Sequence, residues 1–113
     1  MNALLIIEDK NDDYKEIIEF KDINDKNSFS YENEDESCFV EVLDEGLHIK
    51  RRLLSHQTNI ILDNNPIIEI STLEGTLKFY PKDIAIKKNN DIITIVYTIN
   101  DTIKELTIKY IGV

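Results

Sequence analysis

The feature that most constrains this chain is its alternation of apolar and polar residues in short segments that end at Asn, Asp or Gly. Successive side chains of a β-strand point to opposite faces, so such alternation is typical of strands with one buried face. Turn residues interrupt the pattern about every ten residues, the spacing of a meander. No apolar stripe of helical spacing runs longer than two turns. The pattern therefore predicts an all-β, antiparallel chain.

The C-terminal half allows a stricter test, because a two-residue turn determines which residues face each other across a hairpin. A turn at Asn100-Asp101 places apolar residues opposite apolar ones, and turns at Asn89-Asn90, Glu74-Gly75 and Asn64-Asn65 extend the same face. The expected pairs are Ile95 with Leu106, Ile93 with Ile108, Ile86 with Ile93, Ile84 with Ile95, Thr72 with Leu77, Ile70 with Phe79, and Ile61 with Ile68. Pro81 cannot donate to a ladder, so we expect a bend or bulge there.

The N-terminal half is expected to form strands at Ala3 to Glu8, Tyr14 to Ile23, Ser28 to Glu32, Ser37 to Leu43 and Gly46 to Leu54. The total of about ten strands far exceeds the strand content of an average globular protein. A chain tolerates so much sheet when the sheet closes on itself or folds into two layers. We expect residues 1–113 to form a single β-barrel domain.

The order of the segments along the chain is similar to that of a known family. The similar segments are YKEIIEFK (residues 14–21), SFSYE (28–32), EGLHIKR (45–51), STLEGTLKF (71–79), and IITIVYTI (92–99) with the closing ELTIKYIG (105–112). In this order the chain resembles the YwiB-like family of uncharacterised bacterial proteins. The resemblance implies a lipocalin-like (calycin) β-barrel, here of about 8–10 strands, and no known enzyme activity, cofactor or substrate.

Charge narrows the range of partners. The chain has 22 Asp plus Glu against 13 Lys plus Arg, a net charge of -9. This charge repels phosphate backbones and anionic membranes at long range, so neither nucleic acid nor a membrane is an expected partner. The first residues contain too short an apolar run for a signal peptide or a span, and a cytoplasmic location is expected. The single cysteine, Cys38, is expected to be a small core residue.

The segment GLHIKRRLLSHQ (46–57) holds both histidines and the only two arginines. Strand alternation sends His48, Lys50 and Arg52 to an outer, solvated face and Arg51 to the apolar face. With a four-residue loop (43–46), Arg51 lies near Cys38; with a three-residue loop it shares the inner face with Glu41. A buried guanidinium stays charged, so Arg51 needs an anionic or carbonyl partner, within the chain or on a ligand.

Two hydroxyl groups, those of Thr72 and Tyr97, are also expected on the apolar face. With Arg51 they either orient an amphipathic ligand in the barrel or satisfy one another in a packed core. The two histidines are too far apart on a straight strand for a metal site, and the acidic residues 32–36 lack the spacing of a calcium loop. No spacing indicates an activated nucleophile or a phosphate loop.

We therefore expect a non-enzymatic β-barrel, without metal or organic cofactor, that binds a small amphipathic anionic ligand through Arg51, Thr72 and Tyr97. The alternative is a regulatory module with a packed barrel whose acidic surface binds a basic protein. The sequence leaves open whether the protein is a monomer or a homodimer.

Overall fold

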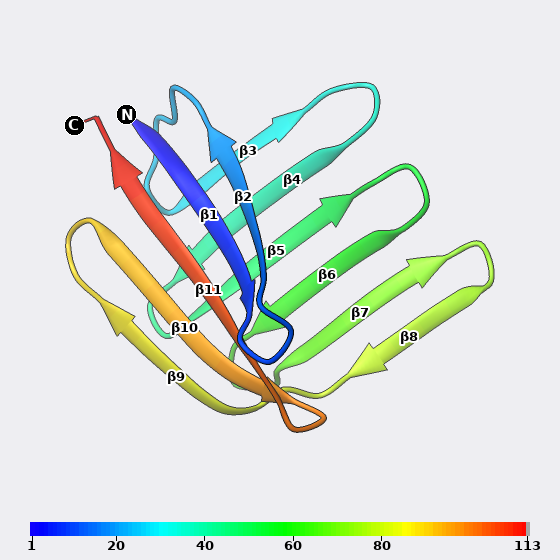
Figure 1. Ribbon diagram of the computed structural model, residues 1–113. Coiled ribbons are helices and arrows are strands. Elements are labelled where there is room, and N and C mark those ends of the chain that lie inside the picture. The colour runs from blue at the N-terminus through cyan, green and yellow to red at the C-terminus, as the bar shows by residue number, and fades with distance from the viewer. Residues whose placement is uncertain (113) are drawn as a thin grey trace. The chain divides into compact units, whose positions relative to one another are not determined.

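A computed structural model describes residues 1–112, and their strands form two antiparallel sheets (Figure 1). The chain divides into two compact units with one sheet each, the first comprising Met1–Asn24 with the segment from Lys82 onward, the second Asp25–Pro81. The prediction of an all-β antiparallel chain is confirmed. Among these residues no helix is long and apolar enough to cross a membrane.

The first unit is a five-stranded sheet in the order β2-β1-β11-β10-β9. Its strands are β1 (Asn2–Asp9), β2 (Tyr14–Phe20), β9 (Lys82–Lys88), β10 (Ile92–Ile99) and β11 (Thr102–Ile111). One face is apolar and buried, and includes Leu5, Phe20, Ile95, Leu106 and Ile108. Because β1 pairs with β11, the first and last strands lie at the centre of this sheet.

The second unit is a six-stranded meander in the order β3-β4-β5-β6-β7-β8. Its strands are β3 (Ser28–Glu32), β4 (Ser37–Leu43), β5 (Gly46–Arg52), β6 (Gln57–Leu62), β7 (Ile67–Thr72) and β8 (Gly75–Phe79). The buried face includes Phe29, Val40, Leu47, Ile49 and Leu62. Cys38 belongs to it and is 1% exposed, which confirms its predicted core position.

The hairpin between β10 and β11 matches its prediction pair for pair, including Ile95 opposite Leu106 and Ile93 opposite Ile108. Asn100 and Asp101 both have positive φ, 48° and 65°, as a type I′ turn requires. The turn residues alone therefore determined this register.

Two hairpins are shifted by two residues, which leaves each side chain on its predicted face. Ile86 faces Ile95 rather than Ile93. The predicted two-residue turn at Asn89-Asn90 does not form, because the Asn89 side chain accepts hydrogen bonds from the Asp91 and Ile92 amides at 3.1 and 2.9 Å. Likewise Ile70 faces Leu77 rather than Phe79, and the turn residues are Leu73 and Glu74.

The predicted pairing of Ile61 with Ile68 is wrong, since Ile61 faces Ile67 and Ile60 faces Ile68. Pro66 has no amide hydrogen to donate, and the Asp63 side chain accepts the Asn65 amide at 2.8 Å, so the connection is longer than a two-residue turn. A one-residue shift moves the side chains of β6 to the opposite face relative to β7, so Ile60, and not Ile61, is buried opposite Ile68.

The expected irregularity near Pro81 lies between β8 and β9 and continues as a bulge. The pairing of β9 with β10 shifts between Val96 and Thr98, and Asp83 has a positive φ of 54°. Tyr97 is therefore the β10 residue that faces the bulge.

Gly46, at the start of β5, has a specific packing requirement. A Cβ atom built there would overlap the backbone carbonyl of Leu62 on the neighbouring strand. A side chain at this position must displace the backbone of one of the two paired strands, which weakens the ladder.

We predict that Gly46→Ala destabilises the protein by about 1–3 kcal/mol, the usual effect of overpacking a well-packed position. Urea unfolding measures the change. Glu45→Ala, at the exposed neighbouring turn residue, is the matched control and should change stability by less than about 0.5 kcal/mol. Equal stability of Gly46→Ala and the wild type would contradict the proposed close approach.

Candidate functional site

Arg51 occupies the position that the four-residue loop predicts. Val42 faces Leu47, Val40 faces Ile49 and Cys38 faces Arg51. Arg51 is half-buried, and its Nε atom is buried. The three-residue alternative, with Glu41 beside Arg51, is wrong because Glu41 faces His48 on the opposite side of the sheet.

Thr72 is on the predicted face, but it is exposed rather than buried. It is the last residue of β7, and its hydroxyl accepts the Glu74 amide at 3.1 Å and donates to the Gly75 carbonyl at 3.4 Å. Local hydrogen bonds of this kind stabilise turns. From the strand spacing, Thr72 lies on the order of 10 Å from Arg51, so the two do not form a compact cluster.

Tyr97 lies in the other sheet and is 4% exposed. Strand pairing aligns it with Lys104 on β11, and Lys104 with Asp9 on β1. Burial and, to a smaller extent, the negative charge of Asp9 raise the pKa of Tyr97 to about 12. Tyr97 therefore remains a neutral phenol that can donate a hydrogen bond.

Asp9 is the buried charged residue of this row, 8% exposed. Its carboxylate lies 2.6 Å from the Lys104 ammonium and accepts the Asn11 and Asp12 amides at 3.0 and 3.2 Å. The Lys104 hydrogen bond, assisted by these amides, lowers the pKa of Asp9 against the opposing effect of burial. Asp9 was not among the predicted site residues, although it continues the inward phase of Ala3, Leu5 and Ile7.

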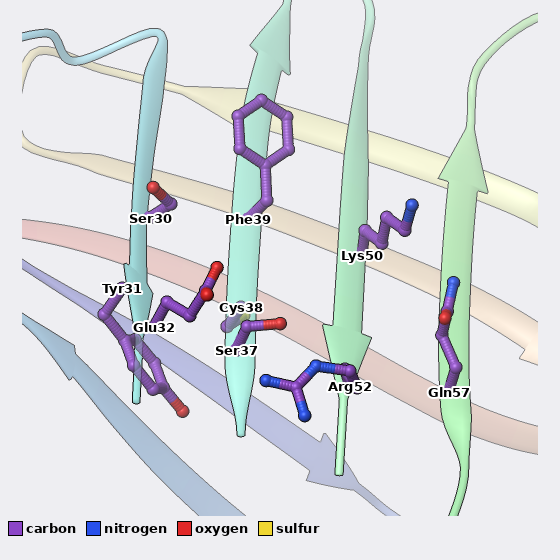
Figure 2. A pocket seen from close by; sticks show the side chains of 9 residues that line it. All are labelled: Ser30, Tyr31, Glu32, Ser37, Cys38, Phe39, Lys50, Arg52 and Gln57. Atoms are coloured by element: carbon purple, nitrogen blue, oxygen red, sulfur yellow. The ribbon is translucent and has the colours of Figure 1, made fainter. Parts of the chain in front are cut away.

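The open face of the six-stranded sheet carries a hollow of about 360 Å³ (Figure 2). Strand pairing arranges its side chains in two rows across β3, β4, β5 and β6. The lining side chains on this face are Glu32, Ser37, Arg52 and Gln57 in one row, and Ser30, Phe39 and Lys50 in the other. Two small serines lie among larger neighbours, and this difference in size produces the hollow.

The charged groups of this hollow are available to a ligand. Within residues 1–112, neither Lys50 nor Arg52 makes an ion pair with a carboxylate, and Arg52 has one long hydrogen bond, 3.4 Å, to the Asn33 carbonyl. Phe39 is 41% exposed, and Figure 2 shows its ring face on from the open side. Both cations lie on the outer face, as alternation along β5 predicts, but they line a hollow where an ordinary solvated surface was expected.

His48 lies further along the same face, where its ring nitrogens are 3.4 Å from Glu41 and 3.0 Å from Asp63. The hydrogen bond with His48 lowers the pKa of Asp63. No group of three or more His, Cys, Asp or Glu side chains in the described part of the chain is arranged to hold a metal ion. We interpret the His48 contacts as cross-strand stabilisation.

Chemically, the hollow offers donors, an aromatic surface and one carboxylate. The guanidinium of Arg52 is suited to a planar carboxylate or phosphate, and serine and glutamine side chains add neutral hydrogen bonds. The exposed ring of Phe39 suits the apolar part of the same molecule. These groups support binding and orientation.

Comparison with known proteins identifies the fold. No family model and no curated protein matches the chain. The crystal structure of the ywiB protein from Bacillus subtilis is similar, with a TM-score of 0.51 and 20% identity over 99% of this chain and 89% of that one. This similarity shows an all-β fold shared with the ywiB protein.

We predict that Asp9→Asn lowers the urea midpoint at pH 7, because it removes the carboxylate that binds Lys104. The pKa of Asp9 is lower in the folded protein, so its charge stabilises the fold above about pH 4 and ceases to do so as pH falls through the native pKa. The difference from the wild type should therefore shrink below about pH 4.

Glu8→Gln is the control for this experiment, because Glu8 is the adjacent carboxylate and pairs with the exposed Lys10 at 3.1 Å. Its effect should be small at both pH values. A loss in Asp9→Asn that is equal at pH 7 and pH 3 would show that the negative charge is not the stabilising element.

Proposed function

We propose that this protein is a non-enzymatic binding protein for a small amphipathic anionic ligand, which it holds on the open face of the six-stranded sheet. The observation that carries the proposal is the position of Arg52, which has no carboxylate partner in the described chain and lines the same hollow as the exposed Phe39. A hollow with an unpaired cation and an apolar surface is suited to a ligand with both characters.

The chemistry of the lining supports an anion. An Arg–carboxylate hydrogen bond is charge-assisted and about twice as strong as a neutral one. Arg52 lies between Ser37 on β4 and Gln57 on β6, so both of these side chains can donate to the anionic group that Arg52 binds. The hollow's volume, about 360 Å³, lies in the range of small-molecule sites.

We further propose that the chain is a YwiB-like protein whose sheets close into a lipocalin-like barrel. The fold similarity to the ywiB protein supports this proposal. A second candidate site is centred on Arg51 alone. Its support is the place of Arg51 on β5, where it faces buried Cys38 and shares the inner face with Leu47 and Ile49.

Two neighbouring arginines on opposite faces provide the test. The probe is 3-phenylpropionate, an aromatic carboxylate, titrated into the protein labelled with nitrogen-15. We expect saturable shifts of the Ser37, Phe39, Lys50 and Arg52 amides, a loss of binding by at least tenfold in Arg52→Gln, and little change in Arg51→Gln.

The reverse result, with binding lost in Arg51→Gln and kept in Arg52→Gln, would contradict the open-face site and favour the second one. Absence of saturable shifts with 3-phenylpropionate and with phenyl phosphate would contradict anion binding altogether. Thermal melting of both variants controls for unfolding, because Arg51 is partly buried.

A further inference from the structure

The hollow on the open face contains a carboxylate as well as cations. Glu32 lies on β3 and Arg52 on β5, with β4 between them, in a single cross-strand row through Ser37. Figure 2 shows the two side chains on opposite sides of β4, each directed toward that strand, with Ser37 on β4 between their strands. The hollow is therefore negative at one end of the row and positive at the other.

These opposite charges do not form an ion pair with each other in the structure. No ion pair joins Glu32 to Arg52 in residues 1–112, and neither residue pairs with another charged side chain there. Their strands are separated by two strand spacings, about 10 Å. A ligand placed over Ser37 can therefore contact both groups at once.

We infer that this pocket takes a zwitterion, namely an α-amino acid or short peptide with an aromatic or apolar side chain. The carboxylate of the ligand binds Arg52 and Ser37, its ammonium binds Glu32 with Ser30 nearby, and its side chain covers the ring of Phe39. The inference rests on the proposed function for the same site: it keeps the carboxylate that Arg52 binds and adds an ammonium group to the ligand.

The charge of the whole chain supports a zwitterion over a simple anion. At a net charge of -9 the protein repels anions at long range. A zwitterion has no net charge and is not repelled, yet it presents a carboxylate to Arg52 at short range. The ammonium group also converts Glu32 from a repulsive neighbour of the ligand carboxylate into an attractive one.

Three probes that share a phenyl ring test the inference. L-Phenylalanine carries both charges, 3-phenylpropionate lacks the ammonium, and phenethylamine lacks the carboxylate. In nitrogen-15 titrations that follow the amides of Glu32, Ser37 and Arg52, we expect L-phenylalanine to bind about threefold to fivefold more tightly than 3-phenylpropionate, the upper part of the range for one exposed ion pair. Phenethylamine should bind more weakly than L-phenylalanine.

The Glu32→Gln variant tests the ammonium contact directly. It should abolish the preference for L-phenylalanine and leave the affinity for 3-phenylpropionate equal or slightly higher. Glu34→Gln is the matched control, since it removes the same charge from an exposed residue in the β3–β4 turn that does not line the hollow. This control should keep the preference.

The outcomes separate the two proposals. If 3-phenylpropionate binds and Arg52→Gln abolishes its binding, but L-phenylalanine binds no more tightly, the zwitterion is wrong and the anion site stands. If Glu32→Gln and Glu34→Gln reduce the preference for L-phenylalanine equally, the preference comes from the overall charge of the protein and not from a contact with Glu32. The inference is then also wrong. If no probe causes saturable shifts, both proposals fail.

Discussion

The pairing of β1 with β11 is the interaction on which the first unit depends. It joins residues at opposite ends of the chain, from Asn2 with Ile111 to Asp9 with Lys104. Without it, the β1–β2 hairpin would be separate from the three strands β9–β11, and an isolated hairpin is at best marginally stable. Closing so long a loop costs conformational entropy, which burial of Leu5, Leu106 and Ile108 offsets. Such non-local pairing also implies slow folding.

Pairing between strands adjacent in sequence could be predicted from the sequence, whereas pairing between distant strands could not. Asn100 and Asp101 take the positive φ that their turn needs, so local chemistry was sufficient there. At Pro66 the missing amide hydrogen lengthened the loop and shifted β6 by one residue against β7. A prediction that assumes a two-residue turn could not anticipate this shift. The partner of β1 could not be found by hairpin reasoning at all, because that reasoning compares only strands adjacent in sequence.

The same distinction explains the candidate sites. Alternation correctly assigned Arg51 and Arg52 to opposite faces of β5, because that property belongs to a single strand. The hollow that Arg52 lines depends on small serines in β3 and β4 that face larger side chains, so predicting it requires the register of all four strands from β3 to β6. The Asp9–Lys104 pair beside Tyr97 required the β1–β11 pairing for the same reason.

The two polar clusters differ in whether their charges are satisfied. In the five-stranded sheet, the Asp9 carboxylate has an ammonium and two amides as partners, so its row is suited to stabilising the fold. In the six-stranded sheet, Glu32 and Arg52 flank Ser37 without pairing to each other, although both have long side chains that point toward the same strand. Exposed charges lose little when left unpaired in water, so stability does not require them to meet. They therefore remain available to a ligand that bridges them, and this difference makes the open face the better candidate for binding.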